Sequence, residues 1–188
     1  MQRMQSILLD VGLINCMART KADFYHAYFV EQKSGLRPSE KLDSSFSLGL
    51  VPTDWYIHES LPHPYNNRVN KLALCACRQI EPLVHIAKQK YGADRIGIVL
   101  GITDNGSEET NAFLSGVMSA SGEGDEQKAV GTSGEADSSS YELNMQCLGL
   151  CAEYLSTFFG ISGFSSTIST ACTSSAHAIS RADELLKS

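Results

Sequence analysis

Short apolar runs alternate along this chain with longer segments of helical periodicity. Three runs are brief and rich in apolar or β-branched residues, and they predict strands at 6–12, 95–101 and 164–169. Apolar residues spaced three and four positions apart predict helices over about 20–35, 66–87, 143–158 and 170–186. A strand, a helix and a second strand in succession favour a parallel sheet with right-handed crossovers. The sequence therefore predicts an α/β fold, with helices flanking the sheet.

Glycine and proline mark where these elements end. Pro82 lies inside the second helical segment and should kink it or restart it, and Gly160 follows the third as a C-cap would. Residues 36–64 hold four prolines and read as an irregular excursion with room for one short strand. Residues 122–140 are rich in Gly and Ser, with five acidic residues against one lysine, and predict a flexible, solvated loop.

Length and composition narrow the class of protein. A chain of 188 residues with 43% apolar and 19% charged residues fits one globular domain over 1–188. Fifteen basic against 21 acidic residues, a net charge of −6, argues against broad nucleic-acid binding. The sequence shows neither a secretory signal nor a run of about 18 apolar residues, the length needed to span a membrane. We therefore expect a cytoplasmic protein without a membrane partner.

The six cysteines are expected to be thiols, because disulfides are uncommon in that compartment. Cys147 and Cys151 lie four residues apart and would share one helix face, as metal ligands sometimes do. They also belong to an apolar stripe, which favours buried core positions over a metal site.

Cys172 stands where the third predicted strand passes into the last predicted helix. Free N–H groups at a helix N-terminus favour a thiolate, and the small neighbours Ala171, Thr173, Ser174 and Ser175 leave room for a substrate. The same N–H groups could stabilise an oxyanion. Position alone does not separate this reactive cysteine from a small buried one.

The segment 169–179, STACTSSAHAI, resembles the active-site signature of the β-ketoacyl-acyl carrier protein synthases, which are condensing enzymes of the thiolase superfamily. The similarity extends over about 6–188, through Gly12, the helix from Asn66, the 96–101 strand and residues 160–164, and is weakest in 36–64 and 122–140. It implies a thiolase-like fold, N-terminal half only, in which a mostly parallel sheet is flanked by helices and the nucleophile begins a buried helix.

The resemblance also implies an activity. Cys172 would take an acyl group from a carrier-protein thioester, and decarboxylated malonyl carrier protein would then attack it, as in fatty acid biosynthesis. The family uses no cofactor or metal, works as a homodimer and binds acyl carrier protein. Its catalytic histidines belong to a C-terminal half that this sequence does not contain, so we expect a fragment that does not condense alone.

Other residues receive weaker expectations. His177 would lie about 140° around the helix from Cys172 and about 7.5 Å along it, which favours a structural role. By resemblance, Arg68 and Lys71 correspond to a basic patch for the carrier protein, although a solvated helix face is the simpler explanation of both residues. Thr103, Asp104 and Gly106 lie in a turn that corresponds to the loop gating the acyl pocket, where a charged Asp104 is unusual.

Three alternatives stay open at this point. One is a polyketide-type or chain-initiating condensing enzyme, which the cysteine motif does not distinguish from an elongating one. Another is a non-catalytic partner subunit, against which the retained Cys172 counts. The third is an unrelated Cys-His hydrolase, for which none of the five histidines has a favourable spacing.

Overall fold

The structure is a computed structural model, and it describes residues 6–38, 46–56, 58–121 and 142–188. The predicted loop at 122–140 therefore lies outside the described residues. Two of the predicted strands form as expected: β3 (Ile98–Gly101) and β4 (Ser165–Ile168) pair in parallel. A second, antiparallel pair joins β1 (Arg37–Pro38) to β2 (Ser47–Leu48), so the described part of 36–64 holds two very short strands rather than one.

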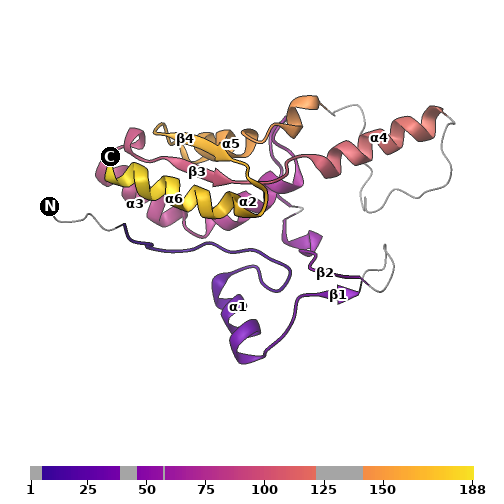
Figure 1. The fold of residues 1–188 in the computed structure, drawn as a ribbon, viewed down its shortest axis with the longest axis horizontal. Coiled ribbons are helices and arrows are strands. Elements are labelled where there is room, and N and C mark those ends of the chain that lie inside the picture. The colour runs from indigo at the N-terminus through magenta and orange to yellow at the C-terminus, as the bar shows by residue number, and fades with distance from the viewer. Residues whose placement is uncertain (1–5, 39–45, 57, 122–141) are drawn as a thin grey trace.

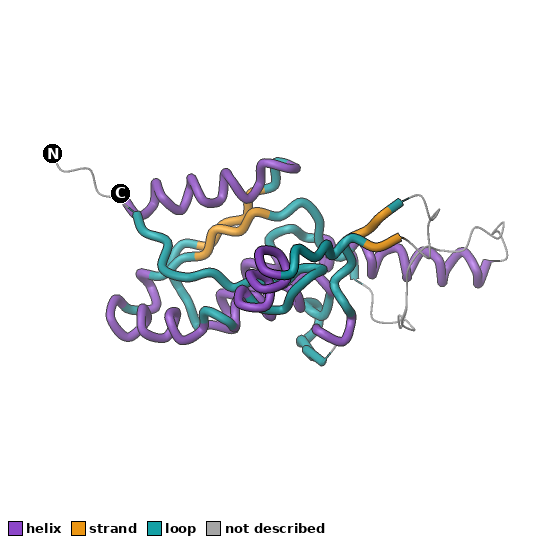
Figure 2. Tube along the Cα trace, turned by 90° about the horizontal axis from the view of Figure 1, so that it is seen from below, coloured by secondary structure: helices purple, strands orange, loops and turns teal. Residues whose placement is uncertain are grey.

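Helices cover both faces of the β3–β4 pair (Figures 1 and 2). The helix α6 (Ser174–Lys187) packs on one face, and α5 (Leu150–Phe159) packs on the other with α2 (Arg68–Arg78) against it. The core lies where β3, α5 and α2 pack together. Its buried members are Leu61, Leu74, Cys151, Tyr154, Leu155 and Phe159. This arrangement confirms the predicted α/β fold and parallel sheet, although α6 buries only one face and leaves Ile179 and Leu186 exposed.

Proline and glycine act where the sequence predicts. The long helical segment stops at Arg78 and restarts as α3 (Glu81–Tyr91), with Pro82 in the first turn, where a missing N–H costs no helical hydrogen bond. Gly160 caps α5 in the left-handed conformation at φ 58°, which glycine adopts without steric cost.

The prediction of a strand at 6–12 is wrong. These residues are extended coil, and Ile7, Leu8 and Leu9 are about four-fifths exposed. The backbone just beyond is instead held by the side chain of Gln79, which accepts from Leu13 N at 3.2 Å and donates to Leu13 O at 2.8 Å. An apolar run alone does not make a strand, because its backbone groups must find a neighbouring strand.

Two helices are shorter than the sequence predicts. The first helix, α1 (Lys21–Tyr25), continues as a π-helix over His26–Val30 and ends before Gly35. The third begins as a 3₁₀ turn over Leu143–Gln146, and α5 starts only at Leu150. Cys147 therefore does not share a helix face with Cys151: it is exposed, whereas Cys151 is fully buried. The predicted core position holds for Cys151 and fails for Cys147.

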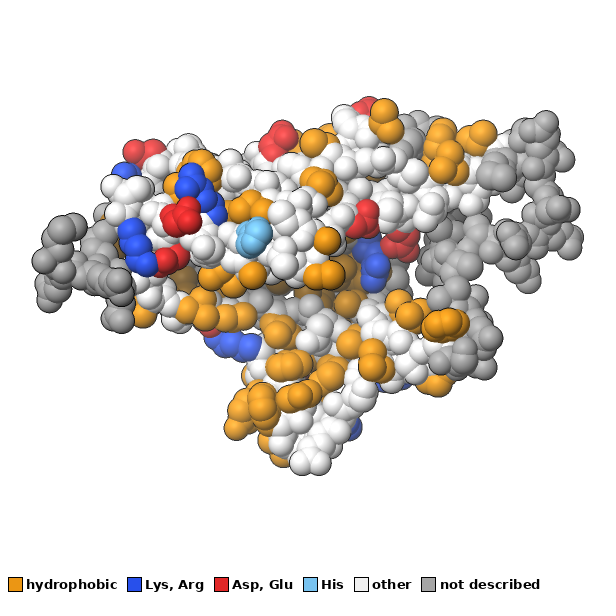
Figure 3. Space-filling view, viewed as in Figure 1, with side chains coloured by type: hydrophobic (Ala, Val, Ile, Leu, Met, Phe, Trp, Pro, Cys, Tyr) orange, Lys and Arg blue, Asp and Glu red, His pale blue; other side chains and the backbone are white. Residues whose placement is uncertain are grey.

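The N-terminal residues 6–38 contact the end of α2, where a Cβ on Gly12 would stand 1.9 Å from Ala76 O, but they carry much exposed apolar surface. Figure 3 shows apolar side chains gathered over the region of α1, below the main body. The large exposed side chains there include Tyr25, Tyr28, Phe29 and Val30. The helix α4 (Ser107–Ser121) also extends away from the body (Figure 1). None of the helices in the described part of the chain is long and apolar enough to cross a membrane.

Candidate active site

The candidate site lies at the carboxyl edge of the β3–β4 pair. Because the two strands are parallel, the turn after β3 and the turn after β4 leave the sheet at the same edge. Gly101, the last residue of β3, lies directly against the start of α6: a Cβ there would stand 2.6 Å from the carbonyl carbon of Ser174. Only glycine permits this approach, which brings the predicted acyl-pocket turn and the Cys172 turn together.

Cys172 lies in a tight turn between β4 and α6. Residues Ala171–Thr173 form a single 3₁₀ turn, and Ser174 begins the α-helix. Ala171 has φ 51°, a left-handed conformation that costs a non-glycine residue about 1 kcal/mol or more. Cys172 is exposed, as a thiol that meets a substrate must be. The structure thus gives the strand–turn–helix context that the sequence predicts, and adds a strained residue that the sequence does not signal.

Hydroxyl groups surround the backbone of this turn. Ser174 Oγ accepts from Thr170 N at 2.9 Å and donates to Ala171 O at 2.8 Å. Thr173 Oγ1 donates to Thr170 O at 2.8 Å. His177 Nδ1 lies 3.4 Å from Thr170 Oγ1, so its ring is directed at these hydroxyls. Sequence reasoning treated Ser174 and Thr173 only as small neighbours of the cysteine.

The turn after β3 places its predicted substrate residues differently. Thr103 and Asp104 are exposed, and Asp104 accepts a 2.5 Å hydrogen bond from Ser107 Oγ. Gly106 is buried with φ 73°, and a Cβ there would stand 2.6 Å from Met145 O. Thr103 and Asp104 are therefore available to a ligand, whereas Gly106 serves the close packing of this turn on the 143–147 segment.

Asn105 is the residue of this turn that sequence reasoning missed. Its side chain is buried, and Nδ2 donates to Met145 O and to Cys147 O, both at 2.9 Å. Its Oδ1 accepts from Nδ2 of Asn67, the N-cap of α2, at 3.2 Å. Asn105 thus ties the turn to two segments about 40 residues away. The Asn-Gly pair at 105–106 signals a turn, but not these partners.

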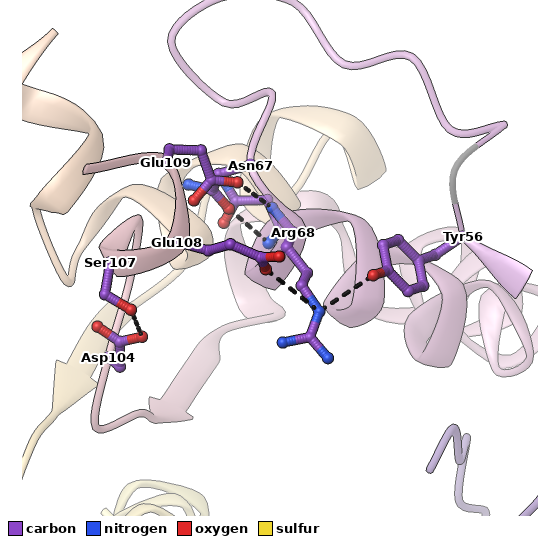
Figure 4. A network of polar contacts seen from close by, with 8 residues as sticks. Tyr56, Asn67, Arg68, Asp104, Ser107, Glu108 and Glu109 are labelled. Atoms are coloured by element: carbon purple, nitrogen blue, oxygen red, sulfur yellow. Dashed lines mark hydrogen bonds and ion pairs between the residues drawn. The ribbon is translucent and has the colours of Figure 1, made fainter. Parts of the chain in front are cut away.

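The predicted carrier-binding residues lie on α2, and Arg68 is already engaged (Figure 4). Its Nε donates to Tyr56 Oη at 3.1 Å and lies 3.6 Å from Glu108 Oε2, and its side chain is 35% exposed. Its backbone N donates to Glu109 Oε1 at 2.8 Å, which joins the starts of α2 and α4. Lys71, one turn along, is partly exposed. The two residues share a helix, but Glu108 already balances the charge of Arg68.

Burial raises the thiol pKa values of three other cysteines, Cys75, Cys77 and Cys151. Loss of hydration raises the pKa of Cys151 to about 12, and it also raises the pKa values of Cys75 and Cys77. These thiols stay protonated near neutral pH and do not act as nucleophiles. Among the described residues, no cluster of His, Cys, Asp and Glu has the arrangement of a metal site.

Comparison with known proteins decides the family. The profile "Beta-ketoacyl synthase, N-terminal domain" matches residues 87–188, more than half of the chain and the part that holds β3, β4 and Cys172. The chain belongs to the β-ketoacyl synthase family. A search of curated proteins finds no match.

A solved structure supports the same assignment. The chain is similar to the ketosynthase ApeO of Xenorhabdus doucetiae, determined in complex with its chain length factor ApeC, with a TM-score of 0.68 and 26% identity. The match covers 94% of this chain and 42% of that one, so this β-ketoacyl synthase sequence spans less than half of the solved chain. The fold is thus that of the thiolase-like ketosynthases, and the expected resemblance is confirmed.

Proposed function

We propose that this chain is the acyl-accepting part of a β-ketoacyl-acyl carrier protein synthase, with Cys172 as the nucleophile. The observation that carries the proposal is the exposed Cys172 in a strained turn at the start of α6, within the family-matched residues. The thiolate would attack the carbonyl carbon of an acyl thioester, and the carrier thiolate would leave and take up a proton. A backbone N–H group at the start of a helix can stabilise the oxyanion that forms in this attack.

The complete reaction needs a second step. An enolate formed by decarboxylation of malonyl carrier protein would attack acyl-Cys172, release the free thiol and leave a β-ketoacyl carrier protein. By family resemblance, the histidines of that step belong to the C-terminal half of the fold. The described residues account for the acyl-accepting half-reaction, through Cys172.

Two pathways fit this chemistry. Fatty acid elongation is our first proposal, and a polyketide-type synthase is the alternative, favoured by the similarity to a ketosynthase that is paired with a chain length factor. A non-catalytic partner subunit is less consistent with the exposed Cys172. The two pathways differ in the products of a complete synthase that contains this chain. Saturated acyl products in the presence of the reducing enzymes of fatty acid synthesis would favour the first proposal, and poly-β-keto products would favour the alternative.

Exposed and partly exposed residues suggest how the chain binds acyl carrier protein, the acyl chain and a second copy of itself. We propose that Lys71, with Arg68, contacts the acidic acyl carrier protein in the cytoplasm, and that Thr103 and Asp104 border the acyl chain. A homodimer is the expected assembly, and the exposed apolar side chains of residues 6–38 and 46–50 are consistent with association. Light scattering on the chain, compared with the mass of 20.4 kDa, would test association.

Acyl transfer tests the proposal on the chain itself. The protein would be incubated with the octanoyl thioester of N-acetylcysteamine, and acylated peptides would be mapped by mass spectrometry. We expect one octanoyl group on Cys172, its loss in Cys172→Ala, and its retention in the matched control Cys147→Ala, which removes another exposed thiol. Octanoylation of Cys147 to the same extent, or none at Cys172, would contradict the proposal.

A further inference from the structure

Three hydroxyl side chains clamp the backbone on both sides of the strained residue Ala171. We call Thr170, Thr173 and Ser174 the hydroxyl clamp. Ala171 holds φ 51° although an alanine Cβ opposes this conformation, so other contacts must stabilise the turn. The clamp supplies these contacts within five consecutive residues that include Cys172.

Ser174 makes the central bonds of the clamp. Its Oγ accepts from Thr170 N at 2.9 Å and donates its single proton to Ala171 O at 2.8 Å, which bridges the Ser169–Thr170 and Ala171–Cys172 peptide groups. Ser174 is 3% exposed, so water does not compete for either bond. A buried hydroxyl with both functions satisfied fixes these two peptide groups relative to each other.

Thr173 closes the turn from the other side. Its Oγ1 lies 2.8 Å from Thr170 O and 3.0 Å from Thr170 Oγ1, and the backbone bond from Thr173 N to Thr170 O, at 3.2 Å, runs beside it. Thr173 is exposed, so its side chain is not needed to fill the core. The hydroxyl therefore serves the turn rather than the packing of the domain.

The sheet holds the clamp in place from below. Gly101 of β3 approaches the carbonyl of Ser174 so closely that a Cβ would stand 2.6 Å from its carbon and oxygen atoms. The start of α6 therefore has no room to move toward the sheet. If the hydroxyls were lost, the turn could relax only outward, on the side where Cys172 is exposed.

We propose that Ser174 and Thr173 are positioning residues for Cys172. Their hydroxyls hold Ala171 in the left-handed conformation and thereby fix where the sulfur of Cys172 lies at the start of α6. The inference rests on the proposed role of Cys172, but its direct claim concerns the reactivity of this thiol. Neither residue touches the substrate in this scheme.

Alkylation rates test the clamp. The full chain would be treated with iodoacetamide near pH 7, and the rate at Cys172 would be divided by the rate at Cys147, which is exposed and lies outside the turn. The wild-type ratio should exceed one because the turn holds the sulfur of Cys172 exposed in one fixed position at the start of α6. Thr173→Val removes the hydroxyl at constant shape and should lower the ratio roughly tenfold, whereas Thr173→Ser keeps it and should preserve the ratio.

Ser174→Ala is the second variant, and it should lower the ratio at least as much. The buried Cys75 and Cys151 report folding in the same experiment, because they are labelled only if the domain opens. If Ser174→Ala unfolds, the comparison of Thr173→Val with Thr173→Ser still tests the positioning role, because Thr173 is exposed. A wild-type ratio near one, or equal ratios in Thr173→Val and Thr173→Ser, would overturn the proposal. If acyl transfer fails but the alkylation ratio is still lower in Thr173→Val than in Thr173→Ser, the proposed function is refuted and the positioning role is not.

Discussion

Replacement of Asn105 by alanine should destabilise the domain more than any exposed change nearby. The substitution removes three hydrogen bonds and leaves Asn67 Nδ2, Met145 O and Cys147 O without this partner. A buried polar group left unsatisfied costs about 1–3 kcal/mol, and water entering the vacated space would recover part of this cost. We therefore expect the free energy of unfolding to fall by about 2–4 kcal/mol.

Thermal unfolding followed by circular dichroism measures this loss. For a domain of this size, about 1 kcal/mol shifts the Tm by roughly 2–4 °C, so Asn105→Ala should lower it by roughly 5–15 °C. The control is Ser107→Ala, which removes only the exposed hydrogen bond to Asp104 and should cost about 0.5 kcal/mol or less. Equal Tm values for the two variants would refute the assignment of Asn105 as the residue that ties this turn to its neighbours.

Three further predictions concern packing, pH and charge. Gly101→Ala should destabilise the domain by about 1–3 kcal/mol in urea unfolding because its Cβ would overlap Ser174, whereas Gly116→Ala, with open space around it, should not destabilise it. Burial raises the pKa of Cys151 from 9.0 to about 12, so the unfolded chain loses this proton first, and from this group the free energy of unfolding should fall by about 1.3 kcal/mol between pH 8 and pH 10. In Cys151→Ala, the fall in the free energy of unfolding between pH 8 and pH 10 should be smaller by that amount. An unchanged fall would contradict the raised pKa of Cys151. Lys71→Glu should weaken binding of an acidic acyl carrier protein in low-salt titrations, and an unchanged Kd would remove Lys71 from the proposed contact.

Local sequence signals predicted the parts of the fold that depend on neighbouring residues. The apolar run of β3, the small and β-branched residues of β4, the restart at Pro82 and the cap at Gly160 are each signalled by a few consecutive residues. The position of Cys172 between strand and helix follows in the same way. These features depend on periodicity and backbone preference, which a single sequence contains.

The features that sequence reasoning missed depend on distant partners. Residues 6–12 have strand-like composition, but the chain beyond them bonds to Gln79 instead of a strand. The partners of Asn105 lie about 40 residues away, and no spacing rule connects them. The left-handed Ala171 is also hidden, because alanine is not a residue that signals this conformation.

The most direct test of the central claim is protection of Cys172 by its own acyl group. The chain would first be incubated with an octanoyl thioester and then labelled with iodoacetamide, with Cys147 as the exposed thiol in the same molecule. We predict that labelling of Cys172 is lost, that labelling of Cys147 is unchanged, and that hydroxylamine, which cleaves thioesters, restores Cys172. Equal labelling of Cys172 with and without the acyl thioester would contradict its assignment as the acyl acceptor.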